Sequence, residues 1–499
     1  MASFSRKRVL VLAVAALIVV ASIAGFYIAK GNTLSKVTAS CADPLAGRSM
    51  VKVQLPSPTK FGGVTEFSLP SPLTNPAAPA VAPDGSVWFA EQTIPGLAHL
   101  FPGNGTLVEY AFPGSYYAPT SYGDICSEKS ATWGVALWDG KVWASDVAGN
   151  QLVSLDPSTG NSSTVKLPSS DSFPYTLTVG PDHNLWFTEL FSGKLGEVSS
   201  NGSLTEYQVP QVTKGQMPEP AQIVFANSTV GYYSAIGGGG LEAGGVYSFD
   251  LPRFAPSLVG GQMLTAPTSV TLADGALWVA LHGSSSVGAY NFSTEGWSYF
   301  PTSPVSYVPT TLPYFVNASG DSVWVNEHYG NRMAVIDPVK DSLVEYDEAR
   351  TPVNASTIGN AVTFGYGDGR AWFAESSGNV IGYVDSAFDP GFSTSISGND
   401  TVVVDRGSSA TVDLVVHDTS HMGPLAISFA DSESFTSSPS NITYSALSTS
   451  VTLPKGGESV VPVTVTALQS LKPGAYTAIF TATDGTTYES SFVNIVVPS

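Results

Sequence analysis

Five acidic side chains occupy one position of a repeated motif, in which a tryptophan lies in an apolar strand and a carboxylate follows three residues later. They are Glu91, Asp146, Glu189, Glu327 and Glu375. Carboxylate oxygens bind Ca²⁺ or Mg²⁺, and they also bind sugar hydroxyls. If the strands end at one mouth of a repeat protein, the sequence predicts an acidic rim for a cation or another ligand. In the alternative interpretation, each carboxylate accepts hydrogen bonds from the backbone of the next repeat's loop.

Two histidines next to this position suggest transition-metal chemistry. His282 and His328 each follow a tryptophan-motif position by four residues, in neighbouring repeats, and Glu327 and Glu375 belong to the same part of the chain. Two imidazoles with one or two carboxylates suit a divalent transition metal. Glu327 and Glu375 are also the candidate catalytic residues. In the alternative interpretation, the two histidines are solvated side chains at the rim.

The motif recurs often enough to predict the fold. Its aromatic residues, with Tyr232 filling one gap, recur at intervals of 43 to 55 residues: Trp88, Trp143, Trp186, Trp278, Trp324 and Trp372. This spacing is typical of four-stranded propeller blades. We predict seven blades, with the tryptophans packed between adjacent sheets. Because the last repeat lacks a fourth strand, we expect residues 62–70 to supply it and to close the ring.

The composition predicts an all-β fold for almost the whole chain, since 49 Gly, 35 Pro and only 12% charged residues favour short strands joined by turns. We expect the seven-bladed β-propeller at residues 62–392, after a stalk at 31–61. Beyond it the tryptophans stop, and short strands separated by turns suit an immunoglobulin-like β-sandwich at 393–499.

The N-terminus predicts a membrane anchor. After the basic residues 6–8, the 21 residues from Val9 to Ala29 carry no formal charge, which is long enough to span a bilayer. We therefore expect an uncleaved transmembrane helix at 1–30, with the rest of the chain outside the cytoplasm. The formal net charge of −19 argues against a nucleic acid partner, because it repels phosphate backbones.

Two further features suit an extracytoplasmic location. The two cysteines, Cys41 and Cys126, are predicted to form a disulfide in an oxidising compartment. The second feature is a set of Asn-x-Ser/Thr sequons, which predicts glycosylation. In the alternative explanation, the sequons reflect the composition of turns. The sequons start at Asn104, Asn161, Asn201, Asn227, Asn291, Asn317, Asn354, Asn399 and Asn441.

One complete repeat, PDHNLWFTELFSGKLGEVSSNGSLTEYQVP at residues 181–210, resembles the repeat of the streptogramin lyases, the virginiamycin B lyase family. The resemblance covers residues 62 to about 389 and implies a seven-bladed propeller. It also implies a magnesium-dependent enzyme that opens a cyclic depsipeptide at its ester by elimination.

The catalytic residues that this resemblance implies are only partly present. The family has a histidine after a proline on the first strand of each of its last two blades, and Tyr314 and Asn360 stand at these positions. Ile358 replaces one family glutamate, and Glu375 approximates the other with a displacement of one residue. A phenol is not a neutral base near pH 7. We therefore expect the fold of the family without its lyase activity.

The function expected from these observations is that of a membrane-anchored extracytoplasmic glycoprotein. Its propeller would bind a cell-surface protein, a glycan or a small ligand. The alternatives are a metal-dependent lyase or hydrolase that acts at the propeller mouth, and a structural envelope protein. The one cofactor expected is a divalent cation, Mg²⁺ or Ca²⁺.

Overall fold

The computed structural model describes residues 50–499 apart from several segments within that range. The undescribed residues are 1–49, 71–74, 93–95, 113–131, 148, 212–213, 238–243, 252, 262–263, 306–310, 349–360, 376–377, 422 and 432–440. Several predictions fall on them: the anchor at 1–30, most of the stalk, the Cys41–Cys126 disulfide, and Asn354, Ile358 and Asn360. Within the described ranges, no helix is long and apolar enough to cross a membrane.

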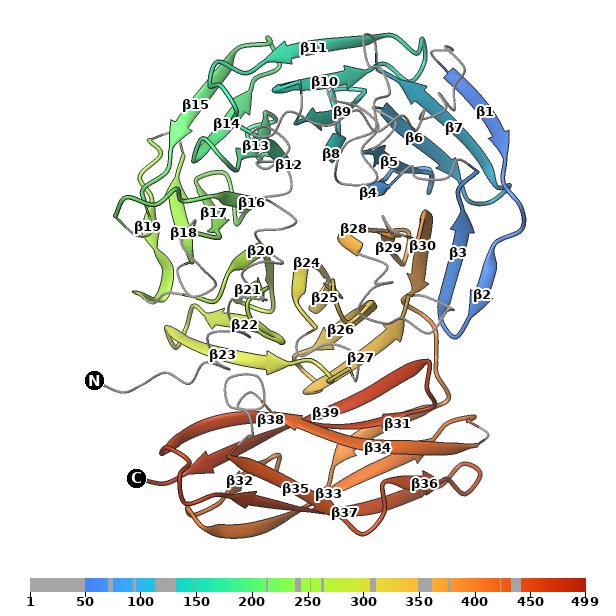
Figure 1. Cartoon of the computed structure of the whole chain (residues 1–499), viewed down its shortest axis with the longest axis vertical. Coiled ribbons are helices and arrows are strands. Elements are labelled where there is room, and N and C mark those ends of the chain that lie inside the picture. The colour runs from blue at the N-terminus through green and yellow to red at the C-terminus, as the bar shows by residue number, and fades with distance from the viewer. Residues whose placement is uncertain are drawn as a thin grey trace, which may run out of the picture. The chain divides into compact units, whose positions relative to one another are not determined.

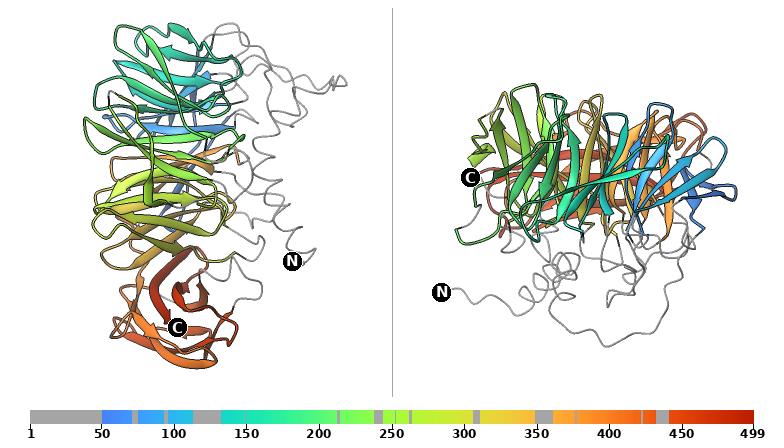
Figure 2. Two further views of the ribbon diagram at one scale, coloured as in Figure 1. Left: turned by 90° about the vertical axis from the view of Figure 1, so that its left-hand side faces the viewer. Right: turned by 90° about the horizontal axis from the view of Figure 1, so that it is seen from above.

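The described chain is built from β-strands and turns (Figures 1 and 2), which confirms the all-β prediction. Helical structure in these residues is limited to the 3₁₀ turn η1 (Val259–Gly261). The hairpins follow from local sequence. Asp139-Gly140 and Asp274-Gly275 have positive φ at both residues, between 45° and 68°, as a two-residue hairpin turn of the favoured twist requires.

The chain divides into two compact units, and the first comprises residues up to 57, 68–270 and 374–380. Among the described residues it holds four antiparallel sheets, in which consecutive strands are hydrogen-bonded neighbours, except that β1 adds to the far edge of the first sheet beside β7. The sheets are β1 (Met50–Gln54), β7 (Thr106–Ala111), β6 (Gly96–Phe101), β5 (Val87–Glu91) and β4 (Pro76–Val81); β11 (Ser162–Lys166), β10 (Gln151–Leu155), β9 (Lys141–Asp146) and β8 (Thr132–Trp138); β12 (Pro174–Val179), β13 (Leu185–Glu189), β14 (Lys194–Val198) and β15 (Leu204–Gln208); β16 (Pro220–Phe225), β17 (Val230–Ala235), β18 (Gly245–Asp250) and β19 (Ser257–Leu258).

The second unit comprises residues 58–67, 271–373 and 381–499. Three more sheets of the repeat are formed largely or wholly from it. They are β20 (Pro267–Ala273), β21 (Ala276–Leu281), β22 (Ser286–Asn291) and β23 (Gly296–Pro301); β24 (Pro313–Ser319), β25 (Ser322–Glu327), β26 (Arg332–Asp337) and β27 (Ser342–Asp347); β2 (Thr59–Phe61), β3 (Val64–Ser68), β30 (Val380–Asp385), β29 (Arg370–Glu375) and β28 (Ala361–Gly367).

The last of these sheets joins strands from the two ends of the repeat region. β28, β29 and β30 lack a fourth strand of their own, and β3 pairs with β30 in its place (Figure 1). This is the pairing expected of residues 62–70. β2 then covers the outer edge of β3, so the sheet ends on a strand of only three residues. Short edge strands limit unwanted pairing with other chains.

The C-terminal residues form a sandwich of two sheets around one apolar core. One sheet contains β39 (Thr487–Val497), β38 (Gly474–Thr483), β34 (Pro424–Asp431) and β36 (Ser450–Thr452), with β32 (Thr401–Val403) parallel to β39. The other has the order β31 (Phe392–Ile396), β33 (Ser408–Asp418), β37 (Glu458–Ala467) and β35 (Ile442–Ala446). Leu414, Val463 and Phe480 are fully buried between them.

The sandwich shares a sheet with the repeat region, which the sequence did not indicate. β39 pairs antiparallel with β27, from Ser342 opposite Ser491 to Tyr346 opposite Thr487, and the result is one nine-stranded sheet. Phe492 and Ile479 of the sandwich enter the same apolar cluster as Trp278. The edge of β27 is therefore covered by the C-terminal strand.

The motif tryptophans pack between neighbouring sheets, as predicted. In the first unit, Trp88 shares a buried cluster with Val142 of the next sheet, and Trp186 shares one with Ile223 of the sheet after its own. In the second unit, Trp324 packs with Phe364. Burial of such large rings at a repeated position stabilises each sheet against the next.

Candidate functional site

The five carboxylates of the motif are buried rather than exposed at a rim. They are the last residues of β5, β9, β13, β25 and β29, and no more than 4% of any of them is accessible to solvent. Asp146 and Glu189 accept hydrogen bonds from the turn that follows the same strand. Burial of this degree favours the alternative interpretation over a ligand rim, with one difference: the loop belongs to the carboxylate's own sheet.

A turn with a small residue three positions later accommodates the acid in four of the five repeats. The Gly149 N–H donates to Asp146 Oδ1 at 2.9 Å, and the Ser192 hydroxyl donates to Glu189 Oε2 at 2.7 Å. A Cβ on Gly149 would collide with the Asp146 carboxylate, and the same holds for Gly330 and Gly378 against the acids three residues before them, Glu327 and Glu375. In these three turns, a glycine three residues after the acid therefore leaves room for the carboxylate. The next residue has positive φ, for example 48° at Asn150 and 65° at Gly193.

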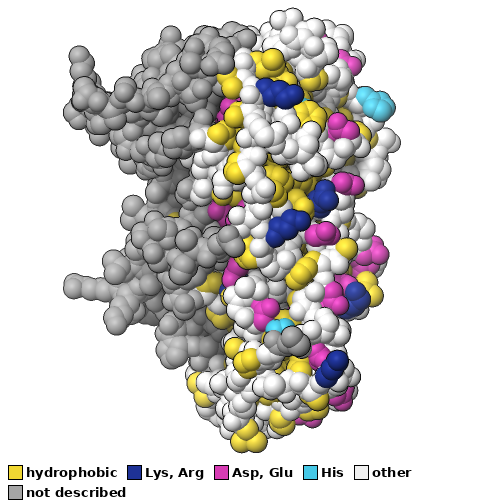
Figure 3. Space-filling model, turned by 90° about the vertical axis from the view of Figure 1, so that its right-hand side faces the viewer, with side chains coloured by type: hydrophobic (Ala, Val, Ile, Leu, Met, Phe, Trp, Pro, Cys, Tyr) yellow, Lys and Arg dark blue, Asp and Glu magenta, His cyan; other side chains and the backbone are white. Residues whose placement is uncertain are grey.

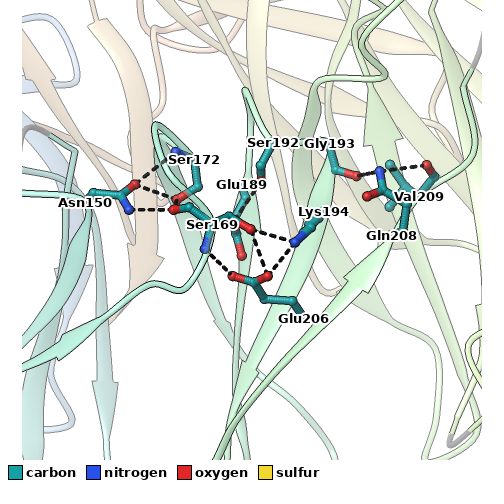
Figure 4. Close-up of polar contacts among 10 residues, drawn as sticks. All are labelled: Asn150, Ser169, Ser172, Glu189, Ser192, Gly193, Lys194, Glu206, Gln208 and Val209. Carbon is teal, nitrogen blue, oxygen red and sulfur yellow. Dashed lines mark hydrogen bonds and ion pairs between the residues drawn. The ribbon is translucent and has the colours of Figure 1, made fainter.

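In the sheet of β12 to β15, the acid at this position is Glu189, and it belongs to a larger polar network (Figure 4). Lys194 Nζ lies 2.5 Å from Glu206 Oε2 on β15 and 2.6 Å from the Ser169 hydroxyl. Burial raises the pKa of Glu189 to about 7. Although burial opposes it, the hydrogen bonds from Lys194 and Ser169 lower the pKa of Glu206. Lys194 therefore offsets negative charge on both Glu189, at the end of β13, and Glu206, on β15.

The sheet of β24 to β27 repeats the arrangement with arginine. Arg332 Nη1 is 3.8 Å from Glu345 Oε1, and its Nε is 3.1 Å from Asp347 Oδ1. The guanidinium also lies 3.7 Å from the ring centroid of Tyr488 on the sandwich strand β39. Burial and the nearby Glu345 carboxylate raise the pKa of Glu327 well above its ordinary value. The charged residues Glu345 and Arg332, which act on Glu327, therefore belong to its own sheet.

The two histidines come together, but they are not solvated, so that alternative was wrong. His282 and His328 are each 2% exposed, and their rings stack with centroids 5.5 Å apart. Burial, followed by the neighbouring His328, lowers the pKa of His282 to about 3, so this imidazole is neutral at ordinary pH. Its Nδ1 is buried without a hydrogen-bond partner.

A metal site at these histidines would need a third ligand. Across the described parts of the chain, no group of three or more His, Cys, Asp or Glu side chains is arranged to hold a metal ion. The charged groups that act most strongly on Glu327 are Glu345, Arg332 and Glu348. The structure thus brings together the two histidines of the predicted site, and within the described residues they do not belong to a group of three ligand side chains.

Tyr314 lies against both imidazoles. Its ring centroid is 4.8 Å from that of His282 and 5.4 Å from that of His328, with edge-to-face geometry in both pairs. Tyr314 is the residue that stands where the family resemblance implies a catalytic histidine. The three residues are far apart in the sequence, whereas β24 and the turns after β21 and β25 place them in one buried cluster. We call His282, Tyr314 and His328 the imidazole–phenol cluster.

A histidine positioned beside a serine was not evident from the sequence, and the sandwich contains one. The Ser395 hydroxyl is 2.8 Å from His417 Nε2, and His417 Nδ1 is 3.5 Å from Glu458 Oε2. The side chains of His417 and Glu458 are 38% and 62% exposed on an open sheet face. Solvent screens such contacts, so they describe a surface network rather than an active site.

Most sequon asparagines in described turns have a local structural role. In Asn104, Asn201, Asn227, Asn291 and Asn399, the side-chain oxygen accepts the backbone N–H of the Ser or Thr two residues later. These asparagines and Asn161 are exposed, whereas Asn317 and Asn441 are partly buried. Turn formation of this kind favours Asn followed by a short polar residue. It accounts for part of the sequon pattern independently of glycosylation.

The acidic surface is dispersed on the face shown in Figure 3, where Asp and Glu side chains lie singly among polar and apolar groups.

No protein-family model matches the chain. Over 129 residues, the chain is 30% identical to a virginiamycin B lyase from Nocardia farcinica. The match covers 26% of this chain and only 40% of that relative's length.

Solved structures extend the similarity to most of the repeat region. Virginiamycin B lyase from Staphylococcus aureus aligns over 98% of its length with 64% of this chain, at 19% identity and a TM-score of 0.52. A streptogramin B lyase structure aligns over 96% of its length with 64% of this chain, at 22% identity and a TM-score of 0.48. Structural similarity at such identity concerns the fold alone. By sequence over part of its repeats and by fold, the chain is a homologue of the virginiamycin B lyases.

Proposed function

We propose that the protein is an extracytoplasmic binding module, anchored in a membrane by residues 1–30, that holds a glycan, a small ligand or a cell-surface protein. The observation that carries the proposal is Tyr314, which packs against His282 and His328 where the family resemblance implies a histidine. A phenol does not replace imidazole as a neutral base near pH 7. The scaffold of the lyases is thus kept while a group required for their chemistry is replaced.

The architecture proposed for this module is one seven-bladed ring followed by an immunoglobulin-like sandwich. Support comes from seven antiparallel sheets of successive strands in the described chain, and from the β3–β30 pair that completes the last of them. Exposed turn asparagines such as Asn161 and Asn201 support glycosylation outside the cytoplasm. The loops that join the strands would then present the binding surface, as is common for scaffolds of this kind.

A binding experiment tests the proposal directly. The purified full-length chain in detergent micelles would be applied to glycan arrays and to a panel of cyclic depsipeptides, with turnover followed in parallel. Saturable binding without release of product supports a binding module. Catalytic turnover of any bound compound contradicts it.

A metal-dependent lyase or hydrolase is the second candidate, and one observation favours it. His282 Nδ1 is buried beside Tyr314 without a hydrogen-bond partner, and a group of a bound compound would supply that partner. In that case, turnover would require Mg²⁺ or Ca²⁺ and would be lost in the variant His282→Gln. Turnover that persists in this variant would exclude His282 as the base.

A further inference from the structure

In three sheets, a glutamate on the second strand and a glutamate on the fourth strand lie on the same face, on either side of the third strand. The three sheets differ in the residue of the third strand that lies between the two glutamates. The strand-end acids Glu91, Glu189 and Glu327 pair across the sheet with Gly96, Lys194 and Arg332. The fourth-strand acids Glu109, Glu206 and Glu345 pair with small residues two positions further along that strand: Ala98, Gly196 and Ala334. The second and fourth strands therefore direct one carboxylate each toward the same place in all three sheets.

Two of these sheets contain a cation at that place. Lys194 contacts Glu206 at 2.5 Å, and Arg332 contacts Glu345 at 3.8 Å. In the sheet of β4 to β7, the equivalent residue is Gly96, and a Cβ there would collide with the carbonyl oxygen of Tyr110. No side chain, and hence no lysine or arginine, fits at residue 96. The first sheet must balance its two acids in another way.

Glu91 and Glu109 are both buried, with exposed fractions of 0% and 2%. No lysine, arginine or neutral donor of the described residues is bonded to either oxygen of the Glu91 carboxylate or to Glu109 Oε1. Among the described residues, the charged group that acts on Glu91 is Glu109 alone. Thr132 from the neighbouring sheet donates its hydroxyl to the backbone oxygen of Glu91, not to the carboxylate.

Two carboxylates at one buried place cannot both stay ionised, because each charge destabilises the other and neither is solvated. A hydrogen bond from a protonated carboxyl to the other carboxylate satisfies both groups with one negative charge. Burial and the nearness of Glu109 raise the pKa of Glu91 well above its ordinary value. Burial likewise raises the pKa of Glu109, while its hydrogen bond with Glu91 opposes that shift. The pair therefore holds one proton between its two carboxyl groups.

We propose that Glu91 and Glu109 form a proton-binding site, in which one proton takes the structural place that Lys194 takes beside Glu206 in the sheet of β12 to β15. Loss of this proton leaves two buried negative charges between β5 and β7. The folded state binds the proton more tightly than the unfolded chain, so the pair stabilises the fold in acid and this stabilisation is lost as the pH rises. The protein thereby suits acidic surroundings.

The test compares matched variants of the full-length chain by urea unfolding at pH 5 and pH 8. In Glu109→Gln, the amide donates to the Glu91 carboxylate and no proton is needed. We expect its folding equilibrium constant at pH 8 to exceed that of the wild type by about tenfold, the factor that corresponds to one pKa unit. The control is Glu206→Gln, which deprives Lys194 of its partner and should lower the equilibrium constant at pH 8.

Opposite signs for these two variants support the proposal, and a decrease in both contradicts it. If Ca²⁺ or Mg²⁺ at pH 8 stabilises the wild type but not Glu109→Gln, a metal cation rather than a proton balances the pair, and the proposal is wrong. Infrared spectroscopy keeps the test valid should a variant fold poorly in urea. At pH 7, the wild type should show one protonated carboxyl more than Glu109→Gln, and equal absorption would overturn the assignment.

Discussion

The ring of Tyr314 meets the ring of His282 edge to face, with centroids 4.8 Å apart and an angle of 86° between the planes. The ring of His328 stacks on that of His282, with centroids 5.5 Å apart. Where the family resemblance implies a catalytic histidine, this chain has Tyr314 in a buried aromatic cluster with a neutral imidazole. The fold is similar to that of a virginiamycin B lyase, and the proposed loss of lyase chemistry rests on this cluster.

The first prediction concerns the protonation of His282. Its pKa is lowered to about 3 by burial and then by His328, so its ring signals in NMR should not move between pH 5 and pH 8. A histidine in the unfolded chain takes up its proton near pH 6.5. The stabilisation linked to neutral His282 is therefore complete above that pH and is lost as the pH falls toward 3. A titration midpoint between pH 5 and pH 8 would show that the cluster opens to solvent.

The second prediction concerns the turn that holds the strand-end acids. Gly330→Ala places a methyl group against the Glu327 carboxylate, and we expect a loss of about 1–3 kcal/mol of unfolding free energy. Gly103 also lies in a turn, but a Cβ there would meet no atom within 4 Å. Gly103→Ala should therefore change the stability by less than about 0.5 kcal/mol. Equal effects in urea titrations would contradict this account of the turn.

The third prediction concerns the sheet shared by β27 and β39. Phe492 is 3% exposed, and its ring lies 5.2 Å from that of Phe300 in the cluster that contains Trp278. Phe492→Ala should cost about 3–5 kcal/mol and change Trp278 fluorescence. Val403 on β32 is 62% exposed, so Val403→Ala serves as the control with little effect. If the sandwich unfolds while Trp278 fluorescence is unchanged, the two regions are not coupled.

The fourth prediction separates turn formation from glycosylation at Asn201. Its side-chain oxygen accepts the Ser203 N–H at 2.9 Å. Asn201→Ala should cost about 1 kcal/mol through loss of this hydrogen bond, whereas Asn201→Asp keeps the acceptor and should be close to neutral. Both variants abolish the sequon. Mass spectrometry of the protein from its native host would therefore show the same loss of mass in both if Asn201 carries a glycan, and no change in either if it does not.

The repeat fold could be predicted because each repeat contains its own local signals. Trp186 marks a buried strand, and Asp139-Gly140 marks a hairpin, without reference to distant residues. The pairing of β27 with β39 left no such signal, since Leu343 and Ser490 come together only through the tertiary fold. Strand alternation alone gives no partner for an edge strand.

The candidate site could be predicted only in part, for the same reason. The spacing of His282 and His328 correctly indicated equivalent positions in adjacent repeats, but it contained no information on burial. For the acids, the glycine three residues later was an available signal: Gly149, Gly330 and Gly378 each indicate a turn that closes over the preceding carboxylate. Tyr314 was identified from the resemblance, whereas its packing against two imidazoles required the structure.

The most direct test of the central claim is turnover of a streptogramin B depsipeptide by the purified full-length chain in the presence of Mg²⁺, followed by mass spectrometry of the ring-opened product. The account predicts no product above the protein-free control, because Tyr314 does not supply the neutral base. Mg²⁺-dependent ring opening that is lost in Glu375→Gln would contradict it.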